Sequence, residues 1–171
     1  MNRTVECYIS DLSSCNMPGG GGAAGVIAAA ASALCSMVAN LTIHKSKGGQ
    51  DIQELLSQTE AITARMLELA KADEKAFEPL GKAMSLKKDD PNKPAAWDAG
   101  VASALSVPMA LLRELSKLFG PMEELADKGY SYAISDVGVA ASACRCAMES
   151  TILNVYINAR FLKDLSLIHI S

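Results

Sequence analysis

Apolar residues recur every three or four positions along most of this chain, which is the spacing of one face of an α-helix. No stretch alternates apolar and polar residues for long enough to predict a strand. The predicted helices span residues 4–13, 22–43, 51 to about 79, 92 or 94 to 118, 121–129 and 135 to about 164. The pattern therefore predicts an all-α fold, a single-domain bundle of about five to six helices.

Polar residues and prolines mark the ends and bends of these helices. Asp51 and the pair Ser135–Asp136 stand where apolar patterns begin, so we expect them to cap their helices and to stabilise the helix dipole. Pro79 and Pro108 lie within long helical patterns, and each removes a backbone donor. The long helices are therefore expected to be kinked or broken at these two positions.

The chain has 171 residues, the size of one domain, which we assign to residues 1–164. Half of the residues are apolar but only 5% are aromatic, so the core has to consist of Ala, Leu, Met and Val. Residues 165–171 follow the last helix abruptly. Their codons can be written as the mosaic-end sequence of a common sequencing adapter, so we expect a non-native tail there.

The charge pattern limits the possible partners. The formal net charge is −3 and no basic stripe occurs, which argues against nucleic acid. Residues 12–43 carry no charge, and about 20 apolar residues suffice to cross a bilayer. This run is mostly Ala and Gly interspersed with Ser, Asn and Thr, so its tendency to insert is weak, and only Arg3 precedes it as a basic residue. We therefore expect a cytoplasmic protein without a membrane partner.

Cysteine and histidine do not form a recognisable site. The five cysteines are an odd number and include no Cys-x-x-Cys pair, which favours reduced thiols. Neither His44 nor His169 has partners at metal-ligand spacing. The sequence predicts neither a disulfide framework nor a metal site.

Four consecutive glycines, Gly19, Gly20, Gly21 and Gly22, lead directly into the Ala-rich helix. Glycine tolerates positive φ and close approach, and the free N–H groups at a helix start bind anions. We therefore expect a turn whose N–H groups face a ligand. A Gly-x-Gly-x-x-Gly pattern ending at Gly25 also matches the dinucleotide fingerprint, but the strand that this motif requires is missing before it.

Asp73 is the candidate catalytic residue. Met66, Leu69 and Phe77 lie at i−7, i−4 and i+4, which places the carboxyl on the buried face of its helix. Burial raises the pKa of a carboxyl group, and a raised pKa suits a general acid or base. The alternative is a surface aspartate within the charged run 71–75.

Several short motifs share one order along the chain with a known family. They are Pro18–Gly21, Ser36–Ile43, Ala72–Phe77, Ser106–Pro108, Lys128–Gly129, Ser135–Ala140 and Asn154–Asn158. Over roughly residues 8–164 the chain resembles the cyclodeaminase/cyclohydrolase family of folate one-carbon enzymes. The resemblance implies an all-helical, usually dimeric enzyme that needs no metal or redox cofactor. It also implies that the natural C-terminus extends beyond residue 164.

The resemblance places Asp73 at the position of the family's acid. The substrate-contact positions that it implies are Gly19, Gly20, Gly21, Gly22, Ser36, Lys45, Ser135, Asp136, Asn154 and Asn158. In two places the chain departs from the family pattern: Gly22 replaces a common Ser, and His44 replaces a common Gly.

For some of these positions a structural role competes with substrate contact. Asp136 either contacts substrate or only stabilises a helix end. Asn154 and Asn158 are four residues apart on one helix face, where they either bind a pterin edge or bridge to a neighbouring helix. Lys45 and Lys47 either attract the glutamate tail of a folate, polyglutamylated or not, or are solvated loop lysines.

The resemblance implies hydrolysis of methenyltetrahydrofolate to formyltetrahydrofolate. The alternative is formiminotetrahydrofolate cyclodeaminase activity, which releases ammonia and shares the methenyl species. A second alternative is a non-catalytic helical bundle in which the glycines only allow close packing.

Overall fold

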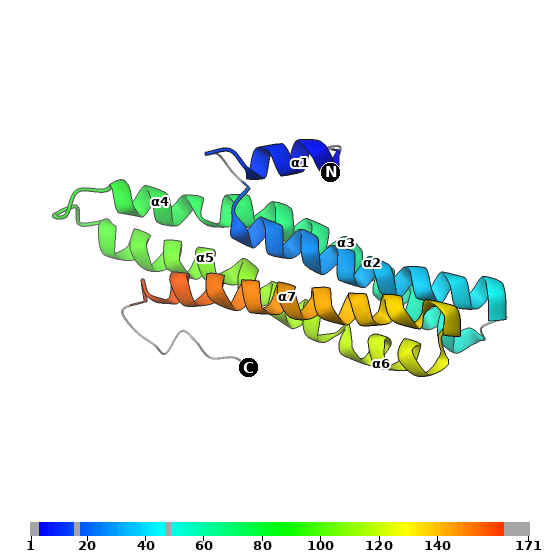
Figure 1. The fold of residues 1–171 in the computed structure, drawn as a ribbon. Coiled ribbons are helices and arrows are strands. Elements are labelled where there is room, and N and C mark those ends of the chain that lie inside the picture. The colour runs from blue at the N-terminus through cyan, green and yellow to red at the C-terminus, as the bar shows by residue number, and fades with distance from the viewer. Residues whose placement is uncertain (1–3, 16–17, 47–48, 163–171) are drawn as a thin grey trace.

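The computed structural model describes residues 4–15, 18–46 and 49–162. Within these residues the chain forms an elongated bundle of helices without strands (Figure 1). The elements are α1 (Val5–Leu12), α2 (Gly20–Ser46), α3 (Gln50–Ala76), α4 (Glu78–Ser85), α5 (Lys93–Ser116), α6 (Phe119–Lys128), the 3-10 turn η1 (Ser131–Ala133) and α7 (Ile134–Ala159). α1 and α4 have only 8 residues each, and the other helices are longer. The predicted all-α bundle is confirmed.

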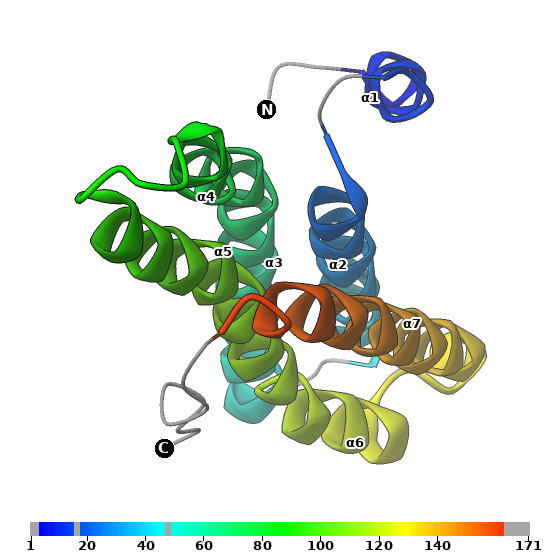
Figure 2. The same cartoon turned by 90° about the vertical axis from the view of Figure 1, so that its left-hand side faces the viewer.

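Small side chains let α2 pack closely against its neighbours. α2 lies against α3 and α7, while α5 lies against α3, α4 and α7 (Figures 1 and 2). Ala28, Ala31 and Ala39 of α2 are fully buried. A Cβ atom added at Gly25 would come within 2.8 Å of the Ala70 Cβ, so α2 and α3 approach each other too closely there for a larger residue. The core of small and aliphatic residues expected from the composition is confirmed.

The glycine run differs from the prediction. α2 begins at Gly20, so these glycines form the first helical turn instead of a turn before it. The Ala23 N–H already donates to the Gly19 carbonyl at 3.1 Å. Gly19, Gly20, Gly21 and Gly22 all avoid the left-handed φ region. The backbone therefore does not use the positive φ that glycine allows, and the Ala-rich helix extends back through Gly22, Gly21 and Gly20.

The acidic helix starts also differ from the prediction. Asp51 lies in the first turn of α3 and does not cap it. α7 begins after Ala133 without a side-chain cap, so Ser135 and Asp136 are its second and third residues. Both aspartates still place negative charge near a helix N-terminus, where it is favourable. α7 ends at Ala159, earlier than expected.

The two interior prolines have different effects. α3 ends at Ala76, and Pro79 lies in the first turn of α4, where its missing N–H breaks no helical hydrogen bond. The expected break at Pro79 is confirmed. Pro108 lies inside α5, which continues to Ser116. Its missing N–H leaves a carbonyl of α5 in need of another donor.

α1 is set apart from the rest of the bundle (Figures 1 and 2). Thr4 caps it by accepting from the Cys7 N–H at 3.2 Å. Tyr8 is its only buried residue, whereas Val5 and Ile9 are 76% and 56% exposed. Within the apolar stripe of this helix, Tyr8 is therefore buried, Leu12 is half-buried, and Val5 and Ile9 remain exposed.

All five cysteines are free, in agreement with the expected thiols.

By length and composition alone, the described stretches Gly20–Lys45 and Lys93–Lys128 are apolar enough to cross a membrane. The core helix of a folded bundle passes the same test, so the pattern alone does not identify a span.

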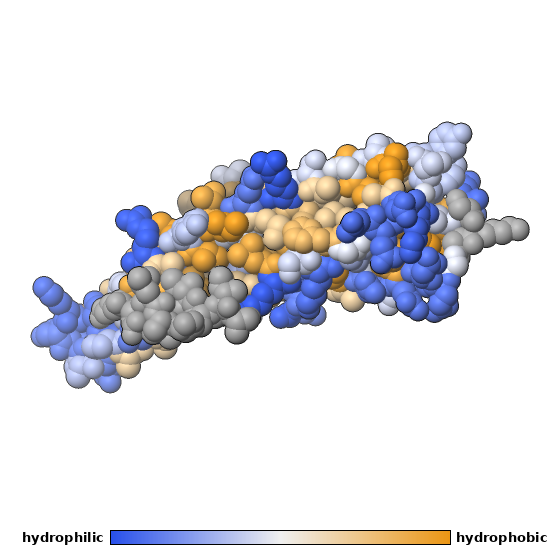
Figure 3. Space-filling model, turned by 90° about the horizontal axis from the view of Figure 1, so that it is seen from below, coloured by the Kyte–Doolittle hydropathy of each residue, from blue (hydrophilic) through white to orange (hydrophobic). Residues whose placement is uncertain are grey.

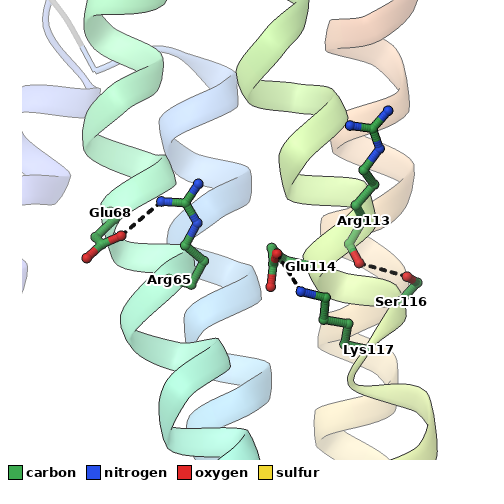
Figure 4. A network of polar contacts seen from close by, with 6 residues as sticks. All are labelled: Arg65, Glu68, Arg113, Glu114, Ser116 and Lys117. Atoms are coloured by element: carbon green, nitrogen blue, oxygen red, sulfur yellow. Dashed lines mark hydrogen bonds and ion pairs between the residues drawn. The ribbon is translucent and has the colours of Figure 1, made fainter. Parts of the chain in front are cut away.

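The outer surface combines ion pairs with an apolar face. Arg65 and Glu68 on α3 pair at 2.9 Å, and Glu114 and Lys117 on α5 pair at 2.7 Å (Figure 4). Apolar side chains gather along the middle of the lower face (Figure 3). The exposed large hydrophobic residues of α7 are Ile134, Val139, Ile152, Leu153, Tyr156 and Ile157.

Candidate active site

One end of the bundle contains a cleft of about 320 Å³. It is formed by the start of α2, the end of α3, the middle of α5 and the end of α7. Its lining residues are Gly19, Gly20, Gly21, Asp73, Ala76, Phe77, Ala104, Asn154, Ile157, Asn158 and Phe161. Asp73 is the only ionisable residue among these lining residues. The structure thus brings Gly19, Gly20 and Gly21, the proposed acid and both asparagines together, whereas the predicted contact residue Gly22 is not among the lining residues.

Asp73 lies directly against the start of α2. The Gly22 N–H donates a hydrogen bond to its carboxylate, so a side chain of α3 occupies one of the donors that a helix start leaves free. A Cβ atom added at Gly21 would fall 2.6 Å from the Asp73 Cγ. Residue 21 therefore has to be glycine for the carboxyl group to take this position.

The environment of Asp73 favours its neutral form. Burial raises the pKa of its carboxyl group, the Gly22 N–H opposes this shift, and the negative charge of Glu74 adds to it. The net effect is a raised pKa. A carboxyl group with a raised pKa, facing a cleft, is suited to exchange a proton with a bound molecule.

Asn158 links α7 to α5 at the point where Pro108 disturbs α5. Its Nδ2 donates to the Ala104 carbonyl at 2.9 Å. Residue 104 is four positions before Pro108, so this is the carbonyl that the proline leaves without its helical donor. The predicted interhelical bridge is therefore present for Asn158. Asn154 instead donates to the Ser150 carbonyl of its own helix at 2.9 Å.

The two amides can also serve a ligand. Each uses its NH₂ group on a main-chain carbonyl, which leaves Oδ1 as the atom able to accept a hydrogen bond from a bound N–H. Their spacing of four residues places both on the face of α7 that lines the cleft.

Four predicted contact residues lie away from this cleft. Ser36 is buried within the bundle, where its Oγ donates to the Thr59 Oγ1 at 2.8 Å and thereby joins α2 to α3. Lys45 is exposed near the C-terminal end of α2, ~36 Å along the helix from Gly21 at 1.5 Å per residue. Ser135 and Asp136 lie at the start of α7, ~27 Å along that helix from Asn154. Lys47 and the predicted tail 165–171 lie outside the described residues.

Two aromatic residues of the cleft were not predicted as site residues. Phe77 was expected in the core, but it is 43% exposed and lines the cleft. Phe161 is held by Trp97, whose Nε1 donates to its carbonyl at 3.0 Å and whose ring lies 5.9 Å from its own. The helical spacing of Phe77 could not reveal its position, because α3 ends one residue earlier.

The fold and the cleft define a class of protein: an all-α bundle with a cleft at one end that is lined by a single carboxyl group among the described residues. The sequence profile of the formiminotransferase-cyclodeaminase family matches residues 4–169. The chain belongs to this family.

Individual relatives agree with this assignment. A methenyltetrahydrofolate cyclohydrolase of Methylorubrum extorquens is 36% identical over 95% of this chain and 82% of its own length. Formimidoyltransferase-cyclodeaminases of Sus scrofa and Mus musculus are 31% identical, but the chain spans only 28% of their length. The crystal structure of a formiminotetrahydrofolate cyclodeaminase from Thermotoga maritima matches with a TM-score of 0.85 at 30% identity, covering 97% of this chain and 83% of that chain.

Proposed function

We propose that this chain is a folate one-carbon enzyme that hydrolyses methenyltetrahydrofolate to formyltetrahydrofolate. The bacterial relative with this name aligns over most of both chains, which supports the choice of reaction. The observation that carries the proposal is the placement of Asp73, the only ionisable group among the lining residues of the cleft, against the glycine start of α2.

In the proposed reaction Asp73 first accepts a proton from water and later donates it to a folate nitrogen. Its carboxylate takes a proton from water as the water oxygen bonds to the cationic carbon that bridges the two folate nitrogens. The resulting carboxylic acid then returns this proton to one of these nitrogens as its bond to the carbon breaks, and the hydroxyl on the carbon releases its own proton to solvent as the formyl C=O forms. A negatively charged Asp73 also attracts the cationic substrate. The oxidation state of the bridging carbon does not change in the reaction.

The rest of the cleft suits the proposed substrate. The asparagine Oδ1 atoms accept hydrogen bonds from pterin N–H groups, and Phe77 and Phe161 provide apolar faces for a flat ring. The N–H groups of the first turn of α2 favour the negative charge that develops on oxygen. We expect no metal or redox cofactor to be required, because proton transfer by one carboxyl group completes the reaction.

Formiminotetrahydrofolate cyclodeaminase activity is the second candidate. The solved relative with the same bundle carries this name. In that reaction a folate nitrogen attacks the formimino carbon, and Asp73 protonates the nitrogen that leaves as ammonia. The same carboxyl group and cleft serve both reactions.

A spectroscopic assay with each substrate tests the proposed function. We expect methenyltetrahydrofolate to be consumed well above the buffer rate, and chelation by EDTA to leave the rate unchanged. Ammonia release from formiminotetrahydrofolate at the higher kcat/KM would favour the second candidate. Binding of folate without turnover of either substrate would support the non-catalytic alternative.

We also propose that the protein works as a cytoplasmic homodimer. The six exposed hydrophobic residues of α7 support this, because such a surface is often an association site. Light scattering at micromolar concentration is expected to give twice the chain mass, and Leu153→Arg, which places a charge on this face, is expected to give the mass of one chain. A monomeric wild type would contradict the proposal.

A further inference from the structure

Tyr8 joins α1 to the neighbourhood of Asp73. It is only 7% exposed, although the helix that carries it lies apart from the rest of the bundle (Figure 2). A Cβ atom added at Gly22 would lie 3.5 Å from the Tyr8 hydroxyl oxygen. The hydroxyl therefore reaches the residue whose N–H is bonded to the Asp73 carboxylate.

This hydroxyl is buried without a hydrogen-bond partner, and it is the only such side-chain group among the described residues. A buried polar group without a partner is unfavourable, so its presence calls for a function. Burial raises the pKa of the Tyr8 hydroxyl, and the nearby charges of Glu74 and Asp73 raise it further. The negative charges of two carboxylates thus act on a donor that has no acceptor in the structure.

We propose that Tyr8 is a positioning residue whose hydroxyl donates a hydrogen bond to the Asp73 carboxylate during the reaction. This inference rests on the proposed role of Asp73 as the proton-transferring group. A phenylalanine would fill the same space, so packing alone does not account for the oxygen. The hydroxyl holds the carboxylate in place in its charged form, the form that accepts the proton from water.

The groups around Asp73 determine the direction in which each substitution changes the Asp73 pKa. Tyr8 approaches from α1, and Glu74 lies next to Asp73 on α3. The α2 and α7 walls of the cleft contribute glycines, asparagines and Ile157, none of which titrates. A donor to the carboxylate lowers its pKa, whereas a neighbouring negative charge raises it. In the reacting complex, removal of the hydroxyl is therefore expected to raise the Asp73 pKa, whereas neutralisation of Glu74 is expected to lower it with or without a ligand.

Tyr8→Phe tests the proposal, with Tyr132→Phe as the matched control. Tyr132 lies in η1 and is 86% exposed, so the loss of its hydroxyl is expected to change nothing. For Tyr8→Phe we expect the rising limb of the kcat–pH profile to move upward by about one pH unit, with a roughly tenfold lower kcat on that limb. The melting temperature of both variants is expected to stay near that of the wild type.

Titration of the Asp73 carboxyl carbon by NMR provides a second readout that does not depend on turnover. With folate bound, we expect the titration of Asp73 to move to higher pH in Tyr8→Phe and to lower pH in Glu74→Gln. An unchanged titration and an unchanged pH profile in Tyr8→Phe would overturn the inference. A shifted titration in a chain that turns over neither substrate would sustain the contact and overturn the proposed function instead.

Discussion

The two ends of the bundle use polar groups in opposite ways. At the far end, the Tyr130 N–H donates to the Thr42 Oγ1 at 2.8 Å, and the Lys128 ammonium pairs with Glu124 at 3.0 Å and with Asp51 at 3.5 Å. The Tyr130–Thr42 and Lys128–Asp51 contacts join separate segments of the chain, so these polar groups are used up in holding the bundle together.

At the cleft end, polar groups remain available to a ligand. Asp73 has a raised pKa, the Tyr8 hydroxyl is buried without a partner, and both asparagines keep their Oδ1 atoms for a ligand. The comparison indicates that function is located where the fold leaves polar groups incompletely satisfied. Substitutions at the cleft end are therefore expected to alter activity more than stability.

Gly21→Ala is expected to have the largest effect on this end. The new Cβ would collide with the Asp73 carboxyl group, which can turn away because it ends a flexible side chain. We expect kcat/KM to fall by about 10²-fold, since a displacement of about 1 Å in a catalytic group has that effect. The melting temperature is expected to change little.

Gly138→Ala, within α7 and away from the cleft, is the matched control for this variant. A Cβ atom there meets nothing within 4 Å, so activity is expected to be retained. Stability is expected to rise by about 0.5–1 kcal/mol, because alanine favours the helix more than glycine does. Equal loss of activity in both variants would contradict the role given to the Gly21–Asp73 contact.

Asn158→Ala tests the link between α7 and α5. The variant leaves the Ala104 carbonyl without the donor that replaces the missing Pro108 N–H, so we expect a loss of about 1–3 kcal/mol in the free energy of unfolding. Adding Pro108→Ala restores the helical N–H and is expected to recover much of this loss. Additive effects in urea denaturation of the single and double variants would show that the two residues are not coupled.

The pH dependence of stability reports on Asp73. Since burial raises the pKa of its carboxyl group, the folded protein holds this proton more tightly than the unfolded chain does. The contribution of Asp73 to stability therefore falls as the pH rises from the unfolded pKa through the folded pKa. We expect Asp73→Asn, measured by urea unfolding, to gain stability relative to wild type over that window. A relative loss over the same window would contradict burial as the dominant cause.

Substitutions in the exposed ion pairs are expected to have the smallest effect on stability and activity. Glu68→Gln removes the partner of Arg65, and the side chains of both residues are about half exposed or more (Figure 4). The change in the free energy of unfolding is expected to stay below about 0.5 kcal/mol, with unchanged kinetics. A larger effect, measured by denaturation at low salt, would mean that α3 depends on its surface charges.

Much of the fold could be predicted from the sequence, because helical periodicity and prolines are local signals. The apolar spacing located the helices, and Pro79 separated α3 from α4. The helix starts were predicted less well. Asp51 and Ser135 are typical capping residues and were predicted as N-caps. The N-cap positions in the structure are Gly49 and Ala133, each two residues earlier in the chain.

The candidate site could be predicted only in part. Asp73, three of the four glycines and both asparagines line one cleft, and their role in substrate contact stays a prediction. Ser36 and Asp136 belong to motifs of the same family, and Lys45 follows one, but all three lie elsewhere, because a motif does not specify which end of a long helix faces the cleft. The contribution of Tyr8 depends on how α1 returns to α2, and local periodicity carries no information about that contact.

Kinetics of Asp73→Asn test the central claim most directly. Asparagine keeps the shape of the side chain and can still accept from the Gly22 N–H, but it cannot exchange the proton. With the substrate that the wild type turns over, we expect kcat and kcat/KM to fall together by roughly 10²–10⁴-fold while the fold is retained. Asp136→Asn, at the other end of α7, is expected to keep its kcat. A near-wild-type kcat for Asp73→Asn, or a severe loss confined to Asp136→Asn, would contradict the account.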